Sequence, residues 1–187
     1  MPFPTFSAGN VLTASDMNAV GLWLVKTQTI GTAVATVDVT SCFSSSYQHY
    51  KIVVDQVTGM ASGANFGARM LVGTTPNTGN IYGILMYASV ASSAAYVGVN
   101  DNNANQFTYL SGTGNGNVGS FHFDIQNPFE ARETRLGPVG FVKTVGATDI
   151  GFYMGALYNS TSYNGIRIQV GTGTMTGGTI RVYGYKP

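Results

Sequence analysis

The side chains that could carry acid–base chemistry are few in this sequence of 187 residues. Of its eight carboxylates, Glu130 and Glu133 form the one pair that is close in sequence. Glycoside hydrolysis needs two carboxyl groups that converge on one bond. Glu130 and Glu133 alternate with Arg132 and Arg135, and such a run is typical of a solvated or intersubunit salt-bridge cluster. The pair therefore predicts ion pairs instead of a catalytic dyad.

The sequence gives little support for a metal site or for a catalytic nucleophile. His49 and His122 are the only histidines, and neither stands in an HxH or HExxH spacing. The single cysteine, Cys42, allows no internal disulfide and is expected to be a small buried side chain. Residues 112–116 are glycine-rich but lack the Lys-Ser/Thr of a phosphate-binding loop. We therefore expect no enzyme activity, no catalytic residue, no cofactor and no metal.

Binding is the chemistry that the sequence supports best. Several tyrosines are interleaved with Asn and Gly, so they could stack on sugar rings while neighbouring amides bond the hydroxyls. The alternative is that most of them pack in a core or between subunits. The candidate receptor or partner contacts are Tyr96, Asn102, Asn103, Tyr109, Asn115, Tyr158 and Tyr163.

The composition is unusually poor in charge. Charged residues make up 9% of the chain, against a usual share of roughly 25%. The net charge is only +1, and the nine Lys and Arg are scattered without a basic patch, so no nucleic-acid partner is expected. A surface with so little charge is better tolerated when much of it is buried against identical copies or a larger assembly. The composition therefore favours a homo-oligomer.

The longest uncharged stretch, between Arg69 and Asp101, is not a membrane span. Asn80 and several Ser and Gly interrupt it, and no apolar run approaches roughly 18 residues. The start, Met-Pro-Phe-Pro, has no basic region before an apolar one, so it does not look like a signal peptide. We therefore expect that the chain is synthesised in a cytoplasm and does not insert into a membrane.

Alternating apolar and polar residues mark the elements that would position these side chains. In residues 166–170 and 180–182 every second residue is Ile or Val, which predicts two strands with one buried face each. The glycine-rich segment 171–178 between them predicts a turn that makes them an antiparallel pair.

The same pattern recurs along the chain. Turn-forming residues at 100–105 and 111–119 predict loops, where a β scaffold usually keeps its contact surface. Ten or more short strands between such turns predict an all-β, jelly-roll-like antiparallel sandwich over residues 25–187. The expected strands are 22–25, 26–30, 34–39, 50–57, 66–72, 81–90, 106–110, 121–125, 141–145 and 150–154.

Residues 1–24 differ from the rest and predict a docking arm. Pro2 and Pro4 favour an extended chain. Thr13 is a suitable N-cap with Asp16 three residues later, which predicts one short N-terminal helix. Large apolar side chains at a chain end need a surface to sit on. The expected docking residues are Phe3, Phe6, Leu12, Met17, Val20 and Trp23.

Two segments resemble a known family when taken together. Residues 6–18, FSAGNVLTASDMN, resemble the F-x-A-G-x-V-L-T-A-x-x-x-N opening of many tailed-bacteriophage tail and minor structural proteins. Residues 177–185, GGTIRVYGY, are similar to the G-T-I-R-V-Y-G ending of the same proteins. Residues 26–31 and 43–47 also fit that pattern.

The resemblance implies a virion protein, assembled in the host cytoplasm, with a usually trimeric jelly-roll-like domain and an N-terminal segment that docks on the particle. Its expected partners are other virion proteins, copies of itself and a host-surface glycan or protein. We expect a tail-fibre or tail-tip protein, with residues 1–24 attached and loops around 100–119 and 159–164 facing outward. The alternatives are a capsid decoration protein and, from another class, a free carbohydrate-binding module.

Overall fold

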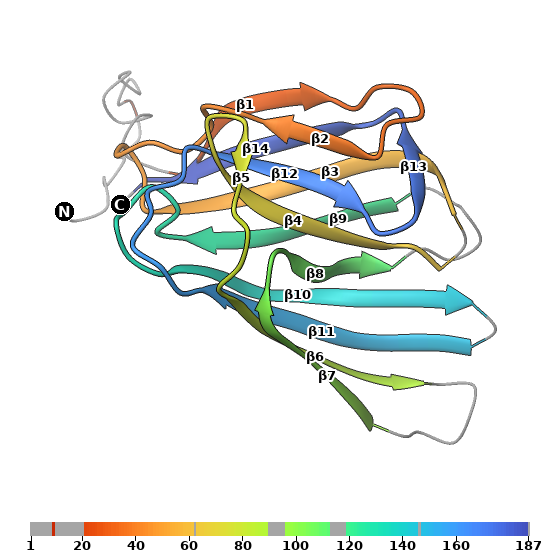
Figure 1. The fold of residues 1–187 in the computed structure, drawn as a ribbon. Helices are drawn as coiled ribbons and strands as arrows, with labels where there is room; N and C mark the ends of the chain where they lie inside the picture. The colour runs from red at the N-terminus through yellow and green to blue at the C-terminus, as the bar shows by residue number, and fades with distance from the viewer. Residues whose placement is uncertain are drawn as a thin grey trace.

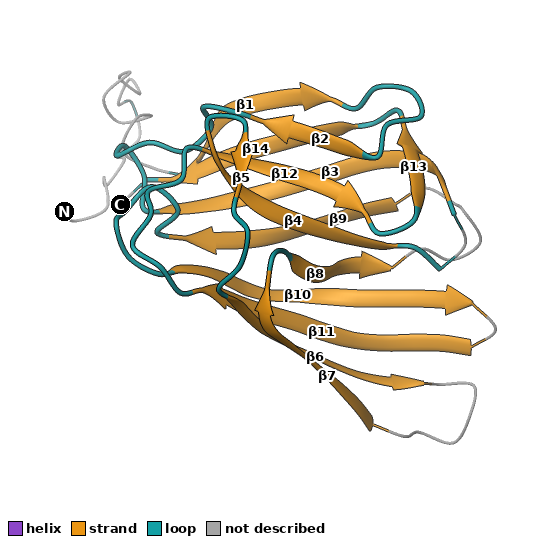
Figure 2. Ribbon diagram, in the orientation of Figure 1, coloured by secondary structure: helices purple, strands orange, loops and turns teal. Residues whose placement is uncertain are grey.

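The computed structural model describes residue 9 and residues 21–61, 63–89, 96–112, 119–145 and 147–186. Within these ranges the chain forms fourteen strands, all paired antiparallel, and no helix (Figures 1 and 2). The predicted all-β antiparallel sandwich is confirmed. The expected helix after Thr13 lies outside the described residues, together with five of the expected docking residues: Phe3, Phe6, Leu12, Met17 and Val20.

The strands form two sheets of unequal width. The larger sheet has the order β1 (Leu22–Thr29), β14 (Thr179–Tyr185), β3 (His49–Met60), β9 (Gly119–Gln126), β10 (Thr134–Val145), β11 (Ala147–Leu157), β6 (Ile81–Ser89) and β7 (Tyr96–Ala104), with β13 (Gly173–Thr176) pairing with β3. The smaller sheet has the order β2 (Thr36–Val39), β12 (Gly165–Val170), β4 (Asn65–Val72) and β5 (Thr75–Pro76), with β8 (Phe107–Gly112) pairing with β4.

The core lies between the inner faces of these sheets. Ile166 and Ile168 of β12 and Ile180 and Val182 of β14 are all fully buried, and they belong to one apolar cluster. Burial of each such side chain contributes about 1.5–3 kcal/mol. The period-two pattern of the sequence thus corresponds to one face per strand that is removed from water.

The expected pairing of the two last strands is wrong. β14 pairs with β1 and β3, whereas β12 pairs with β2 and β4, so the two strands lie in opposite sheets. Both strands have one apolar face, and placing them across the core covers both faces at once. Gly178, at φ 87°, allows the crossing, because a Cβ there would stand 2.3 Å from the carbonyl oxygen of Asp55.

The expected loop at residues 100–105 is also wrong, because β7 runs through Ala104. β7 is an edge strand, and polar residues are tolerated there. Asp101 faces inward, where Tyr153 Oη donates to Asp101 Oδ2 over 2.6 Å and Thr108 Oγ1 donates to the same oxygen. This polar contact joins β7, β8 and β11.

The larger sheet extends beyond the smaller one. In Figure 1, β2, β12 and β4 lie in front of β14, β3 and β9, and β8 lies beside β10; β10, β11, β6 and β7 continue the larger sheet past β4. We call these last four strands the wing. Its inner face is packed, with Leu85, Leu136 and Leu157 buried. Tyr153 is buried there too, and a Cβ on Gly83 would stand only 2.4 Å from its hydroxyl.

The two ends of the described sandwich meet at one point. The backbone N–H of Lys186 donates to the carbonyl oxygen of Gly21 over 3.3 Å. β1 therefore begins beside the end of β14, its only neighbour in the larger sheet.

Cys42 is 1% exposed, and its Sγ–H donates to the carbonyl oxygen of Val39. Burial raises the pKa of this thiol to about 12, so at pH 8 it is a protected, neutral group. We expect Ellman's reagent to leave native Cys42 unmodified and to modify it fully in denaturant. In the control variant Ser45→Cys, with a thiol in an exposed loop, the new cysteine should react at once. Rapid modification of native Cys42 would contradict the packing described.

Candidate functional site

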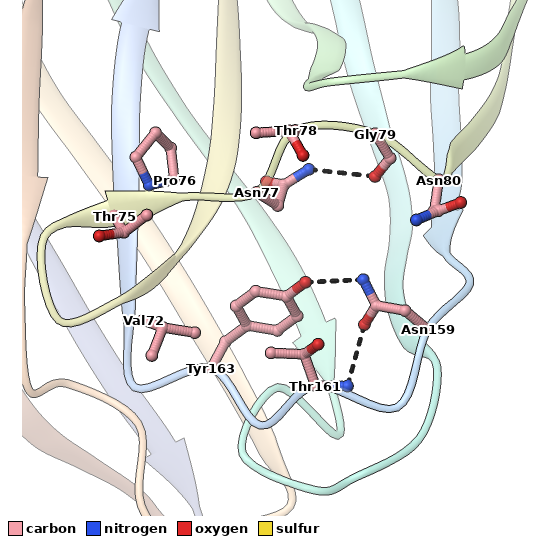
Figure 3. Close-up of a pocket in the computed structure, with 10 residues that line it drawn as sticks. All are labelled: Val72, Thr75, Pro76, Asn77, Thr78, Gly79, Asn80, Asn159, Thr161 and Tyr163. Atoms are coloured by element: carbon pink, nitrogen blue, oxygen red, sulfur yellow. Dashed lines mark hydrogen bonds between the residues drawn. The ribbon is translucent and has the colours of Figure 1, made fainter.

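A surface pocket of about 310 Å³ lies between two connections of the fold (Figure 3). One is the segment from β5 to β6, and the other is the segment from β11 to β12. We call this site the asparagine pocket. Its lining consists of Val72, Thr75, Pro76, Asn77, Thr78, Gly79, Asn80, Asn159, Thr161 and Tyr163.

Asn159 shapes the wall that the β11–β12 connection contributes. Its Oδ1 accepts a hydrogen bond from the backbone N–H of Thr161 over 3.1 Å, the geometry by which Asn builds a local turn. Its Nδ2 donates to Tyr163 Oη over 2.7 Å. Tyr163 is only 3% exposed and its own N–H donates to the carbonyl oxygen of Pro128. This wall therefore presents Thr161 to solvent from a fixed, aromatic-backed turn.

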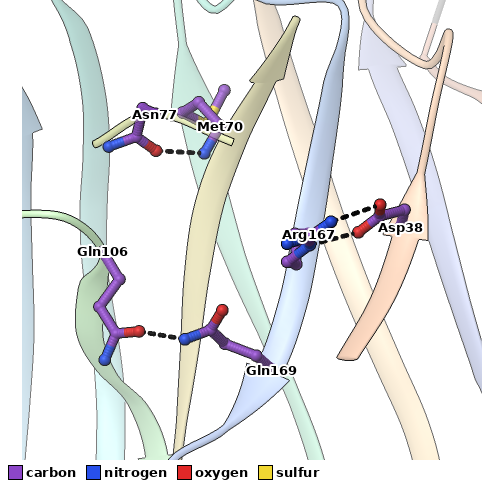
Figure 4. Close-up of polar contacts among 6 residues, drawn as sticks. All are labelled: Asp38, Met70, Asn77, Gln106, Arg167 and Gln169. Atoms are coloured by element: carbon purple, nitrogen blue, oxygen red, sulfur yellow. Dashed lines mark hydrogen bonds and ion pairs between the residues drawn. The ribbon is translucent and has the colours of Figure 1, made fainter. Parts of the chain in front are cut away.

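Asn77 anchors the opposite wall from within. It is 8% exposed, and its Oδ1 accepts from the Met70 N–H over 2.9 Å (Figure 4). Its Nδ2 donates to the carbonyl oxygen of Asn105 over 3.2 Å. The next residues, Thr78 and Asn80, are exposed. The buried amide thus ties β4 to the segment that carries the exposed polar side chains.

Asn80 links the pocket to β7 and to the end of β11. Its backbone N–H donates to Asn103 Oδ1 over 2.8 Å, and its carbonyl oxygen accepts from the Tyr158 N–H over 2.9 Å. Asn80 has φ 65° and Asn103 has φ 54°, a region that Asn adopts more readily than most residues. These two asparagines bring residues that are far apart in the sequence to one rim.

The chemistry of the pocket is neutral hydrogen bonding. None of its ten lining residues carries a carboxylate, imidazole, thiol or cationic group. Hydroxyl and amide side chains both donate and accept, and a buried tyrosine ring lies behind them. The volume is at the lower end of the roughly 300–1,000 Å³ of small-molecule sites. The pocket suits a small uncharged ligand rich in hydroxyl groups.

Of the contact residues expected from the sequence, the structure brings Tyr163 into the pocket and Asn103 to its rim. Asn102 is exposed on β7. Tyr109 packs inward, with its ring 6.1 Å from that of Tyr153. The expected contacts therefore do not form one surface.

The other expected residues lie elsewhere. Tyr158 is 59% exposed, and its ring contacts that of Tyr82 on the wing. Tyr96 begins β7, but its side chain is outside the described part, and Asn115 lies outside the described residues altogether. Trp23, the sixth expected docking residue, is half-buried on β1, and its indole Nε1 is buried without a hydrogen-bond partner.

The lining residues Asn77, Thr78, Asn80, Asn159 and Thr161 were not among the expected contacts, although Asn159 and Thr161 lie in the 159–164 loop that was expected to face outward. A usable signal was present for one of them, because an Asn two residues before a Thr in a loop is the pattern of an Asx turn. No local signal marks the others. They meet only because the sandwich places the β5–β6 and β11–β12 connections side by side.

Polar contacts outside the pocket are structural. Arg167 holds Asp38 through two hydrogen bonds, from Nε at 2.6 Å and Nη2 at 2.8 Å, and Gln169 donates to Gln106 (Figure 4). These contacts cross neighbouring strands of the smaller sheet and its β8 side. Asp38 raises the pKa of the Arg167 guanidinium further above its ordinary value. Such cross-strand pairs stabilise the register.

The acidic and basic run at 130–135 forms surface ion pairs, as expected. Arg132 Nε lies 2.8 Å from Glu130 Oε2, and Arg135 Nη2 lies 2.7 Å from Glu133 Oε1. In the described ranges, no three His, Cys, Asp or Glu side chains come together as a metal site. The same part of the chain contains no helix long and apolar enough to cross a bilayer.

Comparison with protein-family models, with curated proteins and with solved structures finds no match to this chain. What the asparagine pocket does must therefore be inferred from its own geometry and from the sequence.

Removing the hydroxyl of Tyr163 tests the wall of the pocket. In Tyr163→Phe the Nδ2 of Asn159 loses its acceptor, so we expect a loss of about 1 kcal/mol in the free energy of unfolding. The control is Tyr158→Phe, which removes an exposed hydroxyl and should change stability by no more than about 0.5 kcal/mol. Urea denaturation measures both. Equal values for the two variants would show that the Asn159–Tyr163 contact does not hold the turn.

Proposed function

We propose that this chain is a structural component of a tailed-phage virion, a tail-fibre or tail-tip protein that displays the sandwich toward the host surface. The similarity of residues 6–18 and 177–185 to such proteins supports the assignment to a particle. The observation that carries the contact with the host is the asparagine pocket, an uncharged hydrogen-bonding site on the surface of the sandwich.

A neutral glycan is the ligand class that fits this pocket. Sugar hydroxyls both donate and accept, and so do the exposed side chains of Thr78, Asn80 and Thr161. A charged peptide or a phosphate would find no opposite charge among the lining residues, and desolvating an unpaired charge is costly. The ligand would therefore be recognised by hydroxyl geometry instead of charge.

Attachment to the particle belongs to residues 1–24 in this proposal. Leu22 and Leu24, at the start of β1, are 42% and 56% exposed, so the sandwich presents apolar surface where the arm joins it. Such surface suits a protein partner, and it favours the second candidate, a capsid decoration protein, as well as the tail protein. A free carbohydrate-binding module, the third alternative, would not need this exposed apolar surface for its function.

Deletion of residues 1–20 tests the assignment to a virion. We expect the full-length chain to be found on purified particles, at the tail tip by electron microscopy with a specific antibody. The deleted chain should keep its β-type circular dichroism spectrum and be absent from particles, because the arm supplies the attachment. A head location would favour the decoration protein. Absence of the full-length chain from particles, or normal incorporation of the deleted one, would contradict the proposal.

Binding to a glycan array tests the pocket. We expect the protein to bind a neutral host-surface glycan, and the double variant Thr78→Ala/Thr161→Ala to bind it about tenfold or more weakly, since each lost hydrogen bond contributes about 0.5–1.5 kcal/mol. Both threonines are exposed, so the fold should not change. Thr172→Ala, in the exposed turn after β12, is the matched control. Silence across a broad array would refute the pocket assignment but not the virion assignment.

A further inference from the structure

The outer face of the wing carries a continuous patch of exposed apolar side chains. Six residues on two neighbouring strands are between 37% and 52% exposed. In the β11–β6 ladder Phe152 pairs with Met86 and Met154 pairs with Ile84, so these side chains touch as cross-strand neighbours. We call this patch the wing face; its members are Tyr82, Ile84 and Met86 of β6 and Ile150, Phe152 and Met154 of β11.

The central strands of the same outer face carry charged side chains. On β3, β9 and β14 these form two ion pairs, Lys51 with Asp124 at 3.4 Å and Arg181 with Asp55 at 2.6 Å. Among the described side chains of the wing, the charge on this face is Arg135, and Glu133 neutralises it. The larger sheet therefore presents charged central strands and an apolar wing to the outside, and Leu22 and Leu24 of β1 add a smaller apolar surface at its other edge.

The sequences of β6 and β11 are those of strands covered on both sides. In β6, Ile81 and Leu85 are buried while Ile84 and Met86 are exposed, so both faces are apolar. Strands of ordinary half-buried sheets alternate apolar with polar residues, as β12 does, and near-continuous apolar runs are typical of strands with two buried faces. The inner face of the wing is packed, whereas its outer face is exposed although its sequence is typical of a strand face that is buried.

The shape of the wing face allows a similar surface to fit against it. The apolar ridge is flanked by Gly98 on β7, opposite Met86, and Gly140 on β10, opposite Phe152. A Cβ on either glycine would meet no atom within 4 Å, so the surface is open at these two positions beside the ridge. A hollow of about 410 Å³, lined in part by Tyr82, Met154 and Tyr158, opens on the same face. One surface thus offers both projecting and receiving features.

The area agrees with an interface. Six side chains at these exposures leave roughly 80 Å² each, about 500 Å² in all, which is as large as the largest apolar patch of a typical monomer. The six side chains alone thus supply more than half of the roughly 800 Å² per partner of a stable interface. A partner must be as free of charge as this face, and a second copy supplies a surface of that kind.

We propose that a second copy of this chain covers the wing face. The inference does not depend on the proposed virion function. Residues 1–20 are the competing cover within the same chain; they join the sandwich at β1, five strands away from β11, and the deletion described below distinguishes them from a second copy. In the complex, the apolar ridge of each copy would pack against the ridge of the other copy and against the open glycine positions beside it.

Light scattering after size exclusion tests this proposal. At about 50 µM, above the micromolar Kd of weak interfaces of this size, the protein should elute at a multiple of its 19.7 kDa chain mass. The double variant Ile84→Thr/Phe152→Thr should weaken the association by at least about a hundredfold and give a monomer. Gly140→Lys, which places a charge in open space, should do the same without removing an apolar side chain.

The control is Thr172→Lys, which adds the same charge as Gly140→Lys in an exposed turn outside the wing face. Its mass should equal that of the unmodified protein. A monomeric unmodified protein, or a multimer that survives both wing-face variants, would overturn the proposal. It would also be overturned if the protein is monomeric and deletion of residues 1–20 increases binding of an apolar dye, since the arm would then be the cover.

Discussion

The contact between the apolar inner faces of the two sheets determines where everything else in this molecule lies. Strands β12 and β14 face each other across it, and each has its polar residues on the outer side. Because the side-chain period is two, a slip of one residue would turn Arg167 and Gln169 into the core. The register of every strand is therefore tied to burial, and the connections at the strand ends take their places from it.

The asparagine pocket follows from that arrangement. Its walls are connections, but the side chains that fix them, Asn77 and Tyr163, are buried in the edge of the core. An amide buried to this degree must have its donors and acceptors paired, and here the partners are backbone groups of β4 and of the connections. The exposed hydroxyl and amide groups of the pocket are thus held in place by buried, hydrogen-bonded side chains.

The wing results from the mismatch in width between the sheets. The smaller sheet ends at β8, which packs against the inner side of the wing, and none of the described residues covers the outer side of β11 and β6. On the inner side Tyr153 fits over Gly83 and Gly155, and its hydroxyl is bound to Asp101. Burial and this carboxylate both raise the pKa of Tyr153, so the hydroxyl stays a donor at any physiological pH.

Much of the architecture could be predicted from the alternation of residue types. The fold class, most strands and the burial of Cys42 follow from local patterns. The partner of β14 could not be predicted, because alternation shows which face is buried and not which strand lies beside it. Residues 100–105 were misjudged because an edge strand tolerates polar residues. The asparagine pocket joins Asn80, Asn103 and Asn159, and only the packed sandwich brings them together.

The hydrogen bond between Lys186 and Gly21 has a mechanical consequence. β1 has a single neighbour, and the two strands run antiparallel from that point. Tension applied between residue 21 and residue 186 would load the first pair of the ladder alone, and the pairs would then separate one after another, as in a zipper. Tension along β1 toward its far end would instead load all of the pairs at once. The sandwich thus resists force unequally, and the direction of pull decides whether its first strand peels or holds.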